Sequence, residues 1–215
     1  YNLIANGANL QPRTGSTGNT YGRALKKLAN FYLATDQLSS ISTSMSKALP
    51  PKPRSLSQKK SAITIVASQY NPEFTDALVE MTQQELAELN PNLQINTIRV
   101  PGAFEIPVLV ESVMQQQKPA CVIALGLIIR GQTAHGDLVA ESVTQSLQQI
   151  AVYHVTPVIH EVILCDDSKQ AYARCIGSEL NRGKEAARAA VTMMDSMMDS
   201  MSKIQRSNSR AFPNK

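Results

Sequence analysis

Apolar and polar residues alternate in regular blocks from residue 61 to residue 201, and each block has the period of a strand or of a helix. Short β-branched or wholly apolar runs predict buried strands at 61–68, 93–100, 120–126 and 157–164. Apolar positions three or four residues apart predict helices at 71–89, 107–117, 137–154, 168–175 and 181–201. Strand and helix therefore alternate along most of the chain.

This alternation predicts an α/β fold, specifically a three-layer α/β/α sandwich around a four-stranded parallel sheet, as in flavodoxin-like proteins. Parallel strands need crossover helices, and wholly apolar strands need cover on both faces of the sheet. Ligands of such sheets bind beyond the carboxyl ends of the strands. We therefore look for a site in the loops that begin at Ser68, Val100, Gly126 and Leu164.

Charge divides the chain into a basic N-terminal segment and a mildly acidic remainder. Residues 1–60 contain nine Lys and Arg and one acid, Asp36, for a net charge of +8, whereas the other 155 residues contain 12 Lys and Arg and 16 Asp and Glu, for −4. We expect a basic, mostly irregular N-terminal extension at 1–59, a folded domain at 60–201 and a C-terminal tail at 202–215. The extension has one candidate helix at 21–38 and a proline-rich linker at 48–55.

The extension is interpreted as a solvated tail, with the remnant of an organelle-targeting leader as the alternative. Met45 is a candidate start of translation, which would leave residues 1–44 outside the natural protein. We expect no nucleic-acid partner, because aromatic residues are not interleaved with the basic ones. No apolar run approaches the roughly 20 residues that span a bilayer, so no membrane partner is expected either.

Cysteine usage bears on the compartment. The three cysteines, Cys121, Cys165 and Cys175, are odd in number and form no CxxC pair. This usage fits a reducing environment and argues against a disulfide framework. The expected location is therefore cytoplasmic, or organellar if residues 1–44 derive from a targeting leader.

The third of the four loops contains the strongest candidate chemistry, in the segment RGQTAHGD at 130–137. Gly131 permits a tight turn, and amides near Gln132 and Thr133 can point at an anion beside a helix N-terminus. His135 has a side chain suited to moving protons near neutral pH. Taken alone, the pattern equally describes a surface histidine. His135 and Asp137 lack a third ligand with suitable spacing, so no metal is expected.

Five segments at consistent separations resemble the lumazine synthase family over roughly residues 60–201. They are VPGAFEIP at 100–107, ALGLIIRGQTAHGD at 124–137, PVI at 157–159, QAYAR at 170–174 and NRGKEAA at 181–187. The resemblance implies condensation of 5-amino-6-(D-ribitylamino)uracil with 3,4-dihydroxy-2-butanone 4-phosphate to 6,7-dimethyl-8-ribityllumazine, a step of riboflavin biosynthesis. It implies no cofactor and no metal, since the substrates supply the reactivity and the protein mainly orients them.

The resemblance also implies roles for individual residues, the first being proton transfer by His135. Tyr70 matches the aromatic position that stacks on the pyrimidine ring; a helix-start staple is the alternative. Ala103, Phe104 and Glu105 match the segment that holds the ribityl chain. Phe104 could instead anchor a neighbouring subunit, and Glu105 could be an ordinary solvated glutamate.

The remaining matches concern the uracil edge and the phosphate. Ile128 and Ile129 match backbone that reads the uracil edge, although both also suit a strand end in the core. Gln132 and Thr133 match phosphate-binding positions. Arg174 matches the phosphate-binding arginine, whose guanidinium suits a dianion; a helix-surface cation is the alternative.

Three residues depart from the family pattern. Gly136 stands where an aromatic residue is usual, which is expected to loosen the loop beside His135. His160 replaces the phenylalanine with which a neighbouring subunit covers the bound ring, and a histidine can still stack there. Ser178 replaces a common lysine near the phosphate, and Arg182 replaces another lysine.

Family members assemble as homopentamers with shared active sites, and some pentamers build a hollow sixty-subunit shell; the 174–181 interval has a length associated with shell formation. Two rival functions stay open. One is a catalytically silent shell or scaffold of the same fold. The other is a flavin- or nucleotide-binding module, which the lack of a GxGxxG or Walker fingerprint disfavours. The methionines at 193–201 predict a last helix packed on its own domain, or alternatively a partner-binding helix.

Overall fold

A computed structural model describes residues 49–53 and 61–211 of the 215-residue chain. Its elements, in chain order, are β1 (Ala62–Ser68), α2 (Pro72–Leu89), β2 (Gln94–Val100), α3 (Ile106–Gln117), β3 (Cys121–Ile129), α4 (His135–His154), β4 (Val158–Cys165), α5 (Ser168–Cys175) and α6 (Arg182–Ala211). Every strand and helix predicted within residues 61–201 is present. The predicted helix at 21–38 lies outside the described residues.

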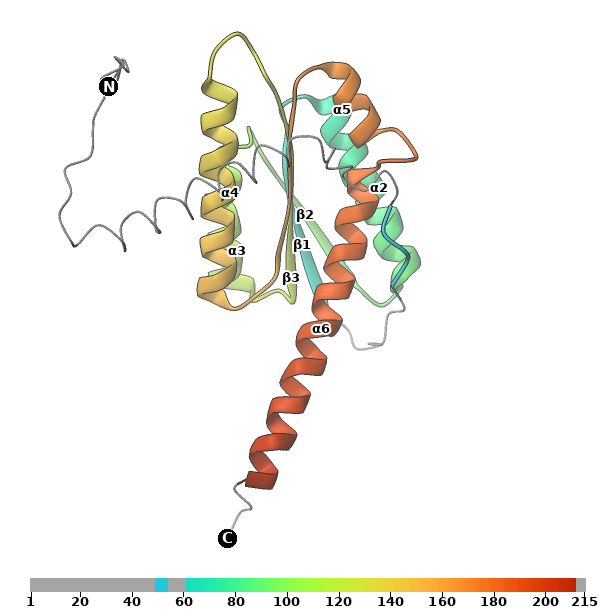
Figure 1. Cartoon of the computed structure of the whole chain (residues 1–215), viewed down its shortest axis with the longest axis vertical. Helices are drawn as coiled ribbons and strands as arrows, with labels where there is room; N and C mark the ends of the chain where they lie inside the picture. Colours follow the sequence, from blue (N-terminus) through green and yellow to red (C-terminus); the bar gives the residue numbers. More distant parts are fainter. Residues whose placement is uncertain (1–48, 54–60, 212–215) are drawn as a thin grey trace, which may run out of the picture. The chain divides into compact units, whose positions relative to one another are not determined.

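The four strands form one parallel sheet in the order β2-β1-β3-β4. The chain moves outward from β1 to β2, returns across β1 to β3, and continues outward to β4. Right-handed crossovers therefore place α2 on one face and α3 and α4 on the other. Figure 1 shows this arrangement, with α5 and α6 beside α2. The predicted α/β/α sandwich with a four-stranded parallel sheet is confirmed.

Each face of the sheet has its own hydrophobic core. Ile65, Leu78 and Leu125 lie in the core beneath α2, α5 and α6, and none of them is exposed to solvent. Val66 and Val110 lie in the core beneath α3 and α4. Neighbouring strand residues such as Ile65 and Val66 enter different cores because successive side chains of a strand point to opposite faces.

The change of direction at β1 creates the place for a ligand. The loops after β1 and β3 leave the sheet on opposite sides, so a crevice opens between the carboxyl ends of these two neighbouring strands. The backbone amide of Gln69 donates to the carbonyl of Val100 over 2.7 Å, and the backbone amide of Tyr70 donates to the carbonyl of Pro101 over 3.1 Å. These bonds hold the loop after β1 against the loop after β2.

The last helix is longer than predicted, ending at Ala211 rather than near Met201. No proline or glycine interrupts residues 184–212, and Lys203 forms an ion pair with Asp199 of 2.6 Å at the helical i, i+4 spacing. Figure 1 shows α6 continuing past the end of the sheet. The methionines of this helix were predicted to pack on the domain. Met194 does so, since it contacts the core, whereas Met201 is 54% exposed.

The described part of the predicted linker, residues 49–53, has neither helix nor strand and runs beside α2 and α6. Lys52 pairs with Glu88 at 2.5 Å and lies 3.9 Å from Glu85. Arg188 of α6 donates to Glu85 over 2.8 Å and also to the carbonyl of Pro50. These contacts tie the end of the linker to the domain.

Candidate functional site

An open cavity of about 530 Å³ lies at the carboxyl edge of the sheet, between the ends of β1 and β3. This volume is within the range of pockets that bind small organic ligands. Fourteen residues line the cavity: Tyr70, Asn71, Gly102, Ala103, Phe104, Glu105, Leu127, Ile128, Ile129, Gly131, Thr133, His135, Gly136 and Val139. None is a lysine or an arginine, so the cavity offers a ligand an apolar wall with a few polar groups.

The turn before α2 presents Tyr70 to the cavity. Asn71 adopts a left-handed backbone conformation with φ of 56°, which asparagine tolerates better than most residues. Its side-chain amide donates to the carbonyl of Leu127 over 3.3 Å, and so fixes the turn to the end of β3. The Tyr70 ring is 72% exposed, so it does not pack as a helix-start staple. An aromatic ring held by its backbone but left uncovered can stack on a ligand.

The loop between β2 and α3 forms a second wall. One carboxylate oxygen of Glu105 accepts the backbone amide of Gly102 over 2.9 Å, which closes the loop on itself. A Cβ atom at residue 102 would lie 2.9 Å from the same oxygen, so a larger residue there would displace the Glu105 carboxylate. Ala103 is buried, whereas Phe104 is 61% exposed beside the cavity. Glu105 therefore has one oxygen committed to the loop and a second that can accept from a ligand.

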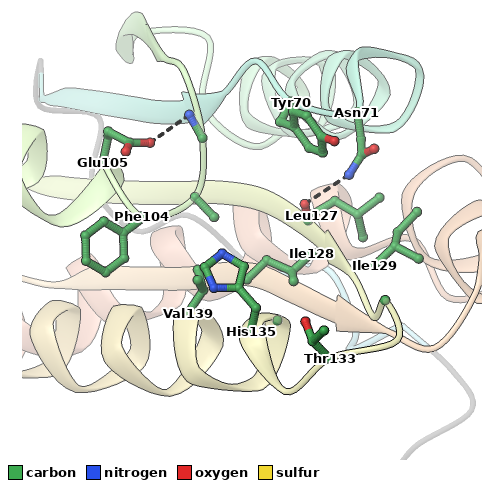
Figure 2. Close-up of a pocket in the computed structure, with 14 residues that line it drawn as sticks. Tyr70, Asn71, Phe104, Glu105, Leu127, Ile128, Ile129, Thr133, His135 and Val139 are labelled. Carbon is green, nitrogen blue, oxygen red and sulfur yellow. Dashed lines mark hydrogen bonds between the residues drawn. The ribbon is translucent and has the colours of Figure 1, made fainter.

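The loop between β3 and α4 forms the third wall, and it contains His135. Figure 2 shows the rings of His135 and Tyr70 on opposite sides of the cavity, both directed toward its interior. His135 is the first residue of α4, so the backbone amides of the first helical turn lie beside it. The helix N-terminus and a titratable ring thus face the same space, an arrangement that suits an anionic group and proton transfer.

Arg130 has a structural position in this loop and does not line the cavity. Its guanidinium pairs with Asp137 at 2.8 Å and also with Asp166, which follows β4. Its amide donates to the carbonyl of Cys165 over 2.9 Å. Arg130 therefore fastens the start of α4 to the end of β4.

The two glycines of this loop differ from expectation. Gly136 belongs to the first turn of α4, so it does not loosen a loop, and a Cβ atom there would lie 3.3 Å from the Ile128 side chain. Gly131 has no positive φ, and a Cβ atom there would meet nothing within 4 Å. The turn at Gly131 therefore does not depend on the conformational freedom of glycine.

The structure gathers eight of the eleven predicted site residues around the cavity and leaves three away from it. Ala103, Ile128, Ile129 and Thr133 line it together with the residues described above. Gln132 is exposed and outside the lining. His160 lies on β4, where its Nε2 is 2.9 Å from the hydroxyl of Thr144 and burial lowers its pKa. Arg174 lies on α5, half-buried.

Six lining residues were not among the predicted site residues: Asn71, Gly102, Leu127, Gly131, Gly136 and Val139. Asparagine directly before a helix is a recognisable sign of a helix N-cap, so the turn at Asn71 could have been anticipated, although its left-handed backbone could not. Leu127 and Val139 are apolar residues among many, and their sequence surroundings give no such sign. Among the described residues, no group of three or more acidic, histidine or cysteine side chains could hold a metal ion, and no helix is long and apolar enough to cross a membrane.

A parallel sheet with helices on both faces, and a cavity at the point where the strand order reverses, define an α/β protein with a small-molecule site. Residues 60–198 match the family model for 6,7-dimethyl-8-ribityllumazine synthase. This match covers more than half of the chain, and the chain belongs to that family.

Individual relatives agree with the family match, and each is named 6,7-dimethyl-8-ribityllumazine synthase. The protein from Coxiella burnetii (strain RSA 493 / Nine Mile phase I) is 37% identical over 138 residues, which are 64% of this chain and 91% of the relative. The protein from Xanthomonas campestris pv. campestris (strain B100) is 38% identical over 134 residues, 62% of this chain and 87% of the relative.

Among solved structures, a GDP-L-fucose synthetase from Naegleria fowleri matches with a TM-score of 0.32 and 11% identity. It covers 74% of this chain, which in turn spans 49% of that protein. A likeness this weak has no bearing on the site.

Proposed function

We propose that this protein catalyses the condensation of 5-amino-6-(D-ribitylamino)uracil with 3,4-dihydroxy-2-butanone 4-phosphate to 6,7-dimethyl-8-ribityllumazine, and so acts in riboflavin biosynthesis. One observation supports this most directly. The two longest family-like segments, at 100–107 and 124–137, are far apart in sequence, yet their residues form two walls of a single cavity. The cavity and the family match therefore concern the same residues.

The protein contributes two things to this reaction: it orients the substrates and it transfers protons. The primary amine of the uracil attacks the ketone, and the resulting carbinolamine loses water to form an imine. Elimination releases inorganic phosphate, and the ribityl-bearing nitrogen then closes the second ring with loss of another water. Both substrates bring all the atoms and the leaving group, so holding them in contact is the main contribution of the site.

The cavity residues have distinct proposed roles in this reaction. The exposed Tyr70 ring stacks on the pyrimidine, and the backbone at Ile128 and Ile129 binds the uracil edge. Ala103, Phe104 and Glu105 hold the ribityl chain, with the uncommitted Glu105 oxygen accepting from its hydroxyls. These assignments agree with an aromatic group on one wall of the cavity and an unpaired acceptor on the next.

His135 is proposed to transfer the protons that imine formation and phosphate release require, since its ring points into the cavity (Figure 2). Thr133 and Gln132 are proposed to bind the phosphate through the loop before α4. No cation lines the cavity, although the phosphate is a dianion at neutral pH. The cavity of one copy can thus hold the substrate rings, but it offers no positive charge to the phosphate.

We propose that a neighbouring copy supplies this charge through Arg174, and covers the bound ring with His160. Both residues lie outside the cavity of their own copy, which is the arrangement that a shared site needs. The proposed assembly is a homopentamer, with the sixty-subunit shell as a further level, and the proposed location is cytoplasmic. Native mass measurement distinguishes a pentamer from a shell.

The proposed activity is tested by mixing the purified protein with both substrates and following the absorbance of the lumazine. The expected result is a rate well above that of the spontaneous condensation at equal substrate concentrations. A rate equal to the spontaneous one would remove the enzymatic function and leave a silent scaffold of the same fold. Heat-denatured protein serves as the control for non-specific acceleration.

The shared site is tested by combining two impaired chains in one assembly. His135→Ala and Arg174→Ala are co-expressed in equal amounts, and the mixed oligomer is assayed beside each variant alone. If a site takes His135 from one copy and Arg174 from its neighbour, random mixing leaves about a quarter of the sites intact. If both residues serve the same site from one copy, every site in the mixture lacks one of them, and the activity stays at the level of the single variants.

A further inference from the structure

Glu161 is the one acidic residue of β4, and the proposed reaction assigns it no role. It lies in β4 opposite Leu125 of β3. Its neighbour His160 bonds to Thr144 of α4, so alternation along the strand turns Glu161 toward the other face, which α5 and α6 cover. The half-buried side chain of Glu161 forms no hydrogen bond or ion pair with any residue of the described chain. An unpaired carboxylate in such a position costs stability, which calls for another explanation.

The charges facing Glu161 come from two helices. Arg182 and Glu185 approach it from α6, and Arg174 from α5; the adjacent residues of β3 are apolar. The Cys175 thiol of α5 also lies near Glu161, but burial raises its pKa to about 12, so it adds no charge near neutral pH. Arg182 is paired with Glu185 at 2.7 Å, while Glu161 itself lies beyond ion-pair distance of both arginines. Burial raises the pKa of the Glu161 carboxyl to about 7, with Glu185 adding to this rise and both arginines opposing it. The carboxyl therefore changes charge near neutral pH.

We propose that Glu161 is a positioning residue that makes phosphate binding by Arg174 and Arg182 depend on its own protonation. As a carboxylate it attracts the two guanidinium groups and lowers the positive charge available to a phosphate. As a neutral acid it leaves both guanidinium groups to the phosphate dianion. This inference rests on the proposed function, because it takes Arg174 as the phosphate-binding arginine, and it adds Arg182, which lies near the same carboxyl, as a second phosphate ligand.

The direction of the pH effect follows from this competition. Above pH 7 the wild-type carboxyl is ionised, so affinity for phosphate falls as the pH rises through that range, and phosphate binding takes up a proton. The phosphate itself becomes a dianion above a pH of about 6, which acts in the opposite direction. Because that second effect is common to every variant, the ratio between wild type and a variant isolates Glu161.

The test measures the dissociation constant of inorganic phosphate by calorimetry on the intact oligomer of Glu161→Gln, at about pH 6 and about pH 8. Relative to this variant, the wild type is expected to bind with similar affinity at the lower pH and about tenfold more weakly at the higher pH, the factor that one pKa unit represents. Glu141→Gln, a matched change on α4, should behave as wild type. A pH-independent ratio between wild type and Glu161→Gln would overturn the proposal.

A second measurement uses the wild type alone, so the proposal stays testable if Glu161→Gln does not fold. Phosphate binding near pH 7 is measured in two buffers with different ionisation enthalpies. Phosphate that binds as the dianion releases protons, so a proton release smaller than the ionisation of phosphate predicts, or a net uptake, supports the proposal. A release equal to that of phosphate alone contradicts it. In steady-state kinetics the KM for the phosphorylated substrate should follow the same pH trend, whereas kcat and the KM for the uracil should not. A merely structural role would not produce this split.

The outcomes separate this inference from the proposed function. Lumazine formation with a phosphate affinity that is independent of Glu161 would refute the inference and leave the enzyme function intact. Phosphate binding controlled by Glu161 without any lumazine formation would support the inference and refute the enzyme function.

Discussion

The two sides of the sheet hold different halves of what the proposed reaction needs. The cavity at the carboxyl edge has exposed aromatic rings, a histidine at a helix start and no lysine or arginine in its lining. The opposite side has Arg174 and Arg182 around Glu161 but no share in that cavity. In the proposed reaction, one side binds the flat rings and moves protons, and the other binds the phosphate.

This division has a structural cause. Residues of β4 alternate between the two faces, and α5 and α6 pack on the face away from α4. Arg174 and Arg182, which follow β4, do not line the cavity of their own copy. In the proposed shared site, two copies placed side by side bring the halves together. The predictions below test each half in turn.

The largest effect is expected on the cavity side, for His135→Ala. General acid–base catalysis typically contributes about 100-fold or more, so kcat should fall by roughly that factor. Some activity should remain, because the condensation also proceeds slowly unaided. Substrate dissociation constants should change little, and stopped-flow or steady-state absorbance measurements would show this. Wild-type turnover in the variant would remove the proton-transfer role.

On the opposite side, Gly183→Ala tests how tightly α6 packs on α2. A Cβ atom at residue 183 would lie 2.7 Å from the carbonyl oxygen of Leu78 and 3.0 Å from the Cβ of Met81. Overpacking of this kind is expected to lower the free energy of unfolding by about 1–3 kcal/mol. Thermal unfolding at equal protein concentration measures it.

The matched control for that change is Gly131→Ala on the cavity side, where an added Cβ would meet nothing within 4 Å. Its stability should stay within about 0.5 kcal/mol of wild type. Equal melting temperatures for the two alanine variants would show that the close contact between α2 and α6 is less demanding than its geometry indicates.

Arg174→Ala is expected to raise the KM for the phosphorylated substrate and to lower kcat/KM by about tenfold to 100-fold. This range corresponds to the loss of one charge-assisted hydrogen-bonded pair. Arg174→Lys keeps the charge but loses the planar fork, so its kcat/KM should fall between those of wild type and Arg174→Ala. Unchanged kinetics in Arg174→Ala would make the residue an ordinary surface cation.

The smallest effect is expected for the exposed ring of Tyr70. Tyr70→Ala removes the stacking surface and should raise the KM for the uracil by about fivefold, in line with the free energy of an aromatic pair. Tyr70→Phe keeps the ring and should behave as wild type. Stability should hardly change in either variant, because the side chain is 72% exposed. A large loss of stability would instead identify Tyr70 as a structural staple.

Much of the fold was predictable because its signals are local. The predicted strand at 61–68 and helix at 168–175 lie within one residue of β1 and α5 at both ends. The end of α6 was missed because the prediction stopped with the last methionine, whereas helix continuation depends on the absence of a breaker. The end of β3 was also missed: the strand continues through Ile128 and Ile129, beyond the glycine at 126.

The candidate site was predictable in its members more than in its geometry. Residues near one another in sequence, such as Ala103 to Glu105, are held by a local turn, and their sharing of one wall follows from the motif. The bond from Asn71 to Leu127 spans 56 positions and had no local signal. The position of Glu161 between arginines of α5 and α6 likewise depends on the packing of three elements.

By itself the sequence determined the order and kind of the elements in residues 61–201, the parallel sheet, and the residues from which the site is built. Periodicity and turn chemistry act over a few residues, so they can be read along the chain. Only the tertiary structure decided that Tyr70 and His135 share a cavity while Arg174 and His160 of the same copy lie outside it. That outcome depends on which face of the sheet each helix covers, and contacts between distant segments set it.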